Sequence, residues 1–285
     1  FIPGLQNRMR AVIAKIALFC LGLCLAVGKS AAVTPPSKGV ETPAGFGKFL
    51  ARQNRIYLSN FRIPQERGKG PVLARAAQQK IILPVILAAY SDRPGVIQPG
   101  TFTEKLFLSY PTGTMSEYYA EISSGGFTLE GEVFGWFATP RTQAQYNSGG
   151  PLGQTASFPE SPEGFVVDAV TAADSQVDFS RFDNDGPDGE PDSGDDDGFV
   201  DALIVVHPGG DAANGDSDNF WSHTSRLDSY IVETNDPAAG GGFIKIDQYS
   251  LVPELVGDGS FEMAAEIGVF CHEFGHQLGL LDLYD

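Results

Sequence analysis

The sequence predicts a mixed α and β domain, of the α/β (α+β) class, built around one sheet. Two observations lead to this prediction. Continuous apolar runs of strand length, such as residues 81–89, are typical of strands buried on both faces. Segments with helical periodicity alternate with these runs, and glycines separate them. Because 42% of the 285 residues are hydrophobic, we also expect a packed core.

The N-terminus has the pattern of a secretory signal peptide, residues 1–32. Basic residues precede the apolar run Ile16–Val27, and small residues follow it up to Ala32. A membrane anchor is the alternative, but the run is short for a span and Lys29 closes it. We therefore expect a secreted, extracellular protein that does not contact the membrane after the signal is removed.

Charge divides the rest of the chain into two parts. Residues 33–80 carry nine Lys or Arg against two acids, a net charge of +7. Residues 81–285 carry six against 34, a net charge of −28. A basic, proline-containing segment between a signal and an acidic domain is typical of a propeptide, with a flexible linker as the alternative. The total of −17 makes nucleic acids and anionic membranes poor partners.

Cysteines do not hold the fold together. Cys20 and Cys24 lie in the expected signal, so the mature chain would keep only Cys271. No disulfide framework is possible with one thiol, and core packing or bound metal must stabilise the domain instead. The basic segment contains no cysteine that could block a metal.

Within residues 81–285 the elements are expected in a definite order. After the strand at 81–89, a helix is expected over Ser116–Ile122, ended by a glycine pair. Alternating polarity then predicts a strand over Phe127–Phe137. A second helix is expected over Gly164–Ala173, and "GFVDALIVVHPGG" predicts another buried strand.

Nine acids and no basic residue lie between positions 183 and 201. Glycines and prolines supply tight turns, so carboxylates could converge on Ca²⁺, which takes six to eight oxygen ligands. The spacing does not fit an EF-hand, and a solvated acidic loop is the alternative. The calcium candidates are Asp183, Asp185, Asp188, Asp192, Asp195, Asp197 and Asp201.

The last residues, "VFCHEFGHQLGLLDLYD", carry the clearest chemical pattern. His272 and His276 are four residues apart, which on a helix places both imidazoles on one face. Two such nitrogens can bind one Zn²⁺, and Glu273 suits a general base. Asp282 is the favoured third ligand, with Asp285 or an acid beyond it as alternatives. Ser260 or Gly259 is expected to begin the helix and Gly279 to end it.

This motif resembles that of the immune inhibitor A-like zinc metallopeptidases. "KIILPVILAAYSD", "MSEYYAEISSGGFTLEGEVFGW" and "FWSHTSRL" follow the order of that family. The resemblance implies a zincin-like catalytic domain over residues 81–285, with a mixed twisted sheet above an active-site helix. It implies zinc on His272, His276 and Asp282, with Glu273 as the base. Cys271 departs from the small residue expected there, and the chain is expected to be truncated soon after the motif.

The predicted function is a secreted zinc endopeptidase, with protein or peptide substrates and its own propeptide as partners. One alternative is a calcium-stabilised adhesion module without turnover, which would have no need of Glu273. Another is a zinc hydrolase of cell-wall peptides, which would use the same motif. His207 and His223 are expected to be core or loop residues.

Overall fold

A computed structural model describes residues 35–43, 46, 80–153, 155–186, 188–280 and 282. The expected signal peptide, and most of the expected propeptide, lie outside the described residues. No helix among these residues is long and apolar enough to cross a membrane.

The order of helices and strands follows the predicted order, with additional elements between them. The strands are β1 (Lys80–Ala89), β2 (Thr128–Ala138), β3 (Ile204–His207), β4 (His223–Arg226), β5 (Val232–Pro237), β6 (Phe243–Ile246) and β7 (Gln248–Pro253). The α-helices are α4 (Pro99–Thr103), α5 (Met115–Ile122), α6 (Gln143–Tyr146), α7 (Pro162–Ala173) and α8 (Ile267–Gln277). Short 3₁₀ or π turns are η1 (Glu104–Leu108), η2 (Phe179–Phe182), η3 (Ala212–Asn214) and η4 (Asp228–Tyr230).

The helices begin where the sequence supplies caps. Thr114 and Glu117 form a reciprocal capping box at the start of α5. Ser161 accepts a hydrogen bond from the backbone N–H of Gly164 and caps α7. Both helices were predicted, to within two residues at each end.

The main sheet is mixed, in the strand order β2-β1-β3-β7-β4. β1 pairs parallel with β2 and β3, and β3 pairs parallel with β7. β4 pairs antiparallel with β7 and ends the strand order on that side. The predicted mixed sheet is thus confirmed. The prediction of one sheet was incomplete, because β5 and β6 form a separate antiparallel pair.

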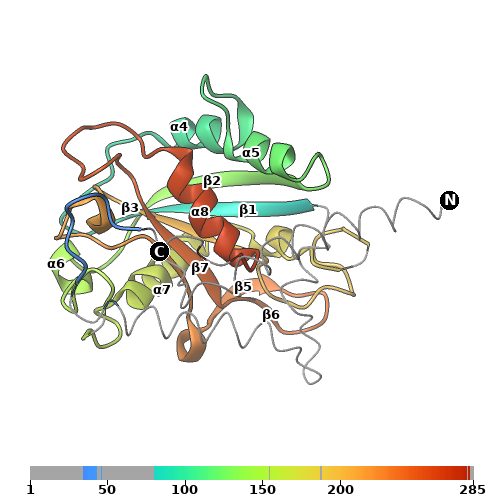
Figure 1. Cartoon of the computed structure of the whole chain (residues 1–285). Coiled ribbons are helices and arrows are strands. Elements are labelled where there is room, and N and C mark those ends of the chain that lie inside the picture. The colour runs from blue at the N-terminus through green and yellow to red at the C-terminus, as the bar shows by residue number, and fades with distance from the viewer. Residues whose placement is uncertain are drawn as a thin grey trace, which may run out of the picture.

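The core lies on both faces of the main sheet, as expected for a central strand such as β1. On one face α7 packs against β1, β2 and β7, in a cluster that includes Phe165 and Val205. On the other face α4, α5 and α8 pack together through Phe102, Tyr119 and Phe274. Figure 1 shows α8 in red, running across the sheet below α4 and α5.

The helix α8 begins later than predicted. Its first residue is Ile267, and Glu266 takes the N-cap position, so a start at Gly259 or Ser260 was wrong. The preceding backbone pairs with the end of β7 instead: Ala265 N–H donates to the carbonyl of Glu254, and Val256 N–H to that of Met263. These hydrogen bonds hold the segment in an extended form. Its backbone groups are therefore not available for another helical turn.

Candidate active site

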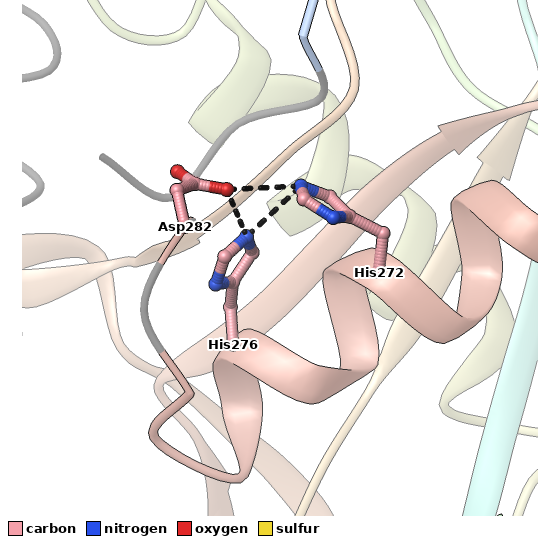
Figure 2. Close-up of side chains that lie close together, drawn as sticks. All are labelled: His272, His276 and Asp282. Carbon is pink, nitrogen blue, oxygen red and sulfur yellow. Dashed lines mark hydrogen bonds and ion pairs between the residues drawn. The ribbon is translucent and has the colours of Figure 1, made fainter. Parts of the chain in front are cut away.

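The helix α8 carries both histidines of the terminal motif. Phe270 and Phe274 bury one side of the helix against α4 and α5, and the Tyr119 hydroxyl donates to the Cys271 carbonyl at 2.7 Å. This packing fixes the helix along its length. His272 and His276 therefore lie one turn apart on the same side, as Figure 2 shows.

A glycine turn brings Asp282 back to the two histidines. Gly279 has a φ of +88°, which L-residues with a Cβ adopt at a cost, and it ends the helix as predicted. The N–H of Leu280 donates to the carbonyl of Gly275 at 3.0 Å and closes the turn. The chain then returns, and the Asp282 carboxylate faces both imidazoles (Figure 2).

Three ligand-type atoms form a nearly equilateral group, here called the histidine triangle (His272, His276 and Asp282). The Nε2 atoms of the two histidines are 3.1 Å apart. Each is also 3.1 Å from Oδ1 of Asp282. The side chains of His276 and Asp282 are buried, whereas that of His272 is 28% exposed. Solvent therefore reaches the histidine triangle from the side of His272.

The tautomer of His276 follows from its second ring nitrogen. Nδ1 lies 2.8 Å from the carbonyl oxygen of Leu280, an atom that can only accept a hydrogen bond. Nδ1 must therefore carry the proton, and Nε2 of the neutral ring presents its lone pair to the triangle. A backbone carbonyl behind an imidazole is the usual support for a metal-ligating histidine.

The spacing and the donor types of the triangle fit zinc. Ligands at about 2.0–2.1 Å from a tetrahedral Zn²⁺ lie about 3.3 Å from one another. The observed separations of 3.1 Å are close to this value. Two imidazoles and one carboxylate are also donors that zinc accepts, with the fourth position left for water or substrate.

Glu273 follows His272 on the helix but does not belong to the triangle. Its side chain is fully buried between α8 and the strand β4. Oε2 accepts a hydrogen bond from the Thr224 hydroxyl at 3.0 Å, and the Glu273 carbonyl lies 2.7 Å from the same hydroxyl. The sequence prediction did not include Thr224. The only sign of Thr224 in the sequence is a polar residue in a short strand. That sign is weak, because the pairing register of β4 cannot be read from the sequence.

A second cluster comes from the acidic loop, and is called the acidic triangle (Asp183, Asp185 and Asp201). One carboxylate oxygen from each lies within 4.8 Å of the others. Asp183 is 1% exposed, and burial, followed by the charges of Asp197 and Asp196, raises its pKa to about 8. Its Oδ2 accepts from the N–H of Gly198 at 2.9 Å, whereas Oδ1 is buried with no hydrogen-bond partner among the described residues.

The other four calcium candidates lie outside this cluster in the loop. Asp188 and Asp195 are joined at the surface, where Asp195 Oδ2 accepts from the Asp188 N–H at 3.3 Å. Asp192 accepts from the Ala239 N–H at 2.7 Å, and Asp197 from the Phe199 N–H at 3.0 Å. These carboxylates satisfy backbone groups of the loop and its neighbours.

The remaining histidines and the cysteine are buried. His207 lies at the end of β3, where burial lowers its pKa to about 3. His223 contacts the carbonyl of Trp221 through Nδ1 and the hydroxyl of Tyr249 through Nε2. Burial raises the pKa of the Cys271 thiol to about 12. None of the three belongs to a metal-type cluster among the described residues.

Comparison with known proteins decides the family. A family model described as "Immune inhibitor A peptidase M6, catalytic domain" matches residues 102–285. The chain belongs to this family. It is 33% identical over 214 residues to immune inhibitor A of Bacillus thuringiensis subsp. alesti, covering 69% of this chain. It is 27% identical over 212 residues to the pre-pro-metalloprotease PrtV of Vibrio cholerae serotype O1, covering 67% of this chain.

The matched regions are short parts of these two relatives. They cover 28% of immune inhibitor A and 21% of the Vibrio protein. The resemblance predicted from the terminal motif is confirmed at the level of the family.

Proposed function

We propose that this M6 chain is a zinc-dependent endopeptidase that hydrolyses protein or peptide substrates. The observation that carries the proposal is the histidine triangle, in which two imidazole nitrogens and a carboxylate oxygen lie 3.1 Å from one another. Family membership supports it, because one of the relatives bears the name metalloprotease. His272, His276 and Asp282 would hold the metal, and Glu273 would act as the base.

In this proposal each residue has its own role in peptide hydrolysis. When bound, Zn²⁺ supplies Lewis acidity that lowers the pKa of a water and polarises a carbonyl. Glu273 accepts the proton of the water that attacks the peptide carbonyl, and then delivers it to the leaving amine. Leu280 keeps the imidazole of His276 in the tautomer that can bind metal. Burial of Glu273 keeps its carboxylate in one position and away from bulk water.

The test is the substitution Glu273→Gln, which keeps the size of the side chain and removes the base. Zinc content should stay the same, while casein hydrolysis should fall by at least about a thousandfold. Zinc is measured by atomic emission, and hydrolysis with labelled casein. A variant that hydrolyses casein as fast as the parent chain would show that Glu273 is not the base.

We also propose that the acidic triangle binds Ca²⁺ and stabilises the domain. Support comes from Asp183, whose Oδ1 is buried without a hydrogen-bond partner among the described residues. The raised pKa of the same carboxyl supports this proposal too, because an ionised Asp183 is costly here without a cation. Carboxylate oxygens are the ligands that Ca²⁺ prefers.

Secretion and latency complete the proposal. Residues 1–32 would direct export, and the basic segment at 33–80 would inhibit the domain until it is cleaved. Two contacts support docking of this segment. The Ser37 N–H donates to the Ala213 carbonyl at 2.7 Å, and the ring centroids of Phe46 and Trp221 are 5.0 Å apart. Inhibition that weakens with salt would indicate ionic docking, whereas inhibition that survives salt but weakens in Phe46→Ala would indicate apolar docking. Full activity of the uncleaved chain would overturn the latency proposal.

A further inference from the structure

A chain of polar side chains interrupts the apolar layer between α8 and the main sheet. Apolar neighbours in that layer include Ile204, Val252 and Phe274. Ser250 lies two residues before Val252 on β7 and so shares its face of the sheet. Thr224 on β4 is the cross-strand partner of Ser250. Both side chains are buried, although a hydrophobic residue would fill either place without a polar group to satisfy.

Hydrogen bonds join these residues into one path. Gln277, in the last turn of α8, donates through Nε2 to Ser250 Oγ at 2.6 Å. Ser250 Oγ lies 2.7 Å from Thr224 Oγ1. Thr224 Oγ1 in turn lies 2.7 Å from the carbonyl and 3.0 Å from Oε2 of Glu273. The path therefore leaves α8 at Gln277, crosses β7 and β4, and returns to α8 at Glu273.

The direction of each bond follows from the chemistry of its ends. The amide nitrogen of Gln277 can only donate, so Ser250 accepts there. A carbonyl can only accept, and so can the carboxylate of a general base, so the single hydroxyl proton of Thr224 points toward Glu273. Ser250 must then donate to Thr224, because the Thr224 proton is already used. The hydroxyl of Ser250 thus points toward Thr224, and that of Thr224 points toward Glu273, where its one proton is shared between the carbonyl and Oε2.

Gln277 is itself held by the backbone of the sheet. Its Oε1 accepts from the N–H of Leu203 at 3.1 Å, and its Nε2 also donates to the carbonyl of Leu203 at 2.8 Å. Leu203 directly precedes β3. The start of the path is therefore anchored by two backbone bonds, which limits rotation of the amide and of the hydroxyls that follow it.

We infer that Thr224 is a positioning residue for the Glu273 carboxylate, with Ser250 and Gln277 orienting its hydroxyl. This inference rests on the proposed function, since it assigns Thr224 a task only if Glu273 is the base. Glu273 lies on a helix and Thr224 on the adjacent strand, so their hydrogen bond fixes the carboxylate from outside its own element. A general base needs such support, because a small misplacement of the base lowers the rate strongly.

The test compares two substitutions introduced into the full chain, with activity measured after the basic segment has been cleaved off by proteolysis. Thr224→Val keeps the branched shape and removes the hydroxyl, whereas Thr224→Ser keeps the hydroxyl. We expect Thr224→Val to lower kcat for a casein peptide at least about tenfold, with KM within about twofold of the parent. Thr224→Ser should recover kcat to within about threefold of the parent. Both should bind as much zinc as the parent.

Thr234→Val is the matched control. Thr234 is also a buried threonine on a strand, and its hydroxyl donates to the carbonyl of Ile244 at 3.0 Å, away from α8. Its loss should lower the melting temperature and leave kcat unchanged. If Thr224 served stability alone, Thr224→Val would behave in the same way, and the inference would be overturned.

Two further outcomes separate the inference from the proposed function. If Thr224→Val does not fold, Ser250→Ala takes its place: it should lower kcat about threefold at unchanged zinc content, and an unchanged kcat overturns the inference. If the activated parent chain binds zinc but does not hydrolyse peptides, the proposed function fails and the assignment of Thr224 fails with it. A parent that is active together with an equally active Thr224→Val disproves the inference alone.

Discussion

The histidine triangle and the acidic triangle are both groups of three metal-type ligands, but they differ in charge. With neutral imidazoles, the histidine triangle carries one negative charge, held by Asp282. The acidic triangle carries three when Asp183, Asp185 and Asp201 are ionised. Two unit charges about 4 Å apart repel by about 4 kcal/mol at an effective dielectric of 20. The acidic triangle therefore needs a cation to remain ionised in the fold, whereas the histidine triangle can persist without one.

The raised pKa of Asp183 reflects this difference in charge, because burial and the neighbouring carboxylates both disfavour its ionised form. Metal removal should consequently act on the two clusters in different ways. Loss of metal from the histidine triangle should remove catalysis from a chain that stays folded. Loss of metal from the acidic triangle should lower stability, because repulsion between the carboxylates is no longer offset.

The largest expected effect comes from His272→Ala. Removing one of three ligands should abolish zinc retention and lower casein hydrolysis at least about a thousandfold. The chain should remain folded, because α8 is held by Phe270, Phe274 and the Tyr119 hydroxyl rather than by His272. Zinc analysis, hydrolysis and circular dichroism measure the three quantities. An unfolded His272→Ala would contradict the comparison, since it would make the histidine triangle a structural site.

Calcium removal should give the next largest effect, and it should act on stability. With Ca²⁺ at a hundred times its dissociation constant, binding adds about 2.7 kcal/mol. Its removal by EGTA should lower the melting temperature by about 5–10 °C in a domain of this size. Because EGTA also binds zinc, the experiment is repeated in His272→Ala, where zinc is already absent. A decrease is expected there as well, because only calcium is lost, and no decrease is expected when Asp183→Asn is combined with His272→Ala.

A melting temperature that does not respond to EGTA in either protein would mean that the acidic triangle holds no calcium. A decrease in the parent alone would assign the effect to zinc. Only a decrease shared by the parent and His272→Ala supports the calcium site.

The pH dependence of stability should sharpen the comparison further. The pKa of Asp183 is raised from 3.8 to about 8 in the folded chain. Between these values the folded chain holds a proton that the unfolded chain has released, so stability must fall as pH rises through this window. In EGTA, the melting temperature of the parent should fall relative to that of Asp183→Asn between about pH 4 and pH 8. Saturating Ca²⁺ should reduce this difference at neutral pH. A constant difference between parent and variant in EGTA would contradict the assigned pKa.

The two clusters also differ in how far the sequence could predict them. The spacing of His272 and His276 implies their geometry, because helical periodicity places both on one face. Gly279 indicated the turn that returns Asp282. In the acidic loop no such periodicity exists, and nine acids offered no reason to prefer Asp183, Asp185 and Asp201. Their selection depends on how the loop folds back between η2 and β3.

The fold was predictable to a similar degree. The long elements β2, α5 and α7 have clear periodicity and β1 has a continuous apolar run, and all four were predicted to within two residues at each end. The start of α8 was predicted too early because Gly259 and Ser260 are good capping residues, while the pairing of Ala265 with Glu254 is a tertiary contact that local patterns do not contain. Thr224 was missed for the same reason, since its importance depends on its pairing with Ser250 across strands.

The smallest effect is expected from Asp195→Asn, which separates the acidic triangle from the general charge of its loop. Asp195 lies at the surface, and hydrogen bonds, first of all from Ser193, lower the pKa of its carboxyl. Because water already screens this charge, its removal should change the melting temperature in EGTA by less than about 2 °C. The response to Ca²⁺ should persist in full. If instability without calcium came from all nine acids together, Asp195→Asn would raise the melting temperature in EGTA as much as Asp183→Asn does. A large rise in Asp195→Asn would therefore replace a defined site of three carboxylates with a diffuse repulsion across the loop.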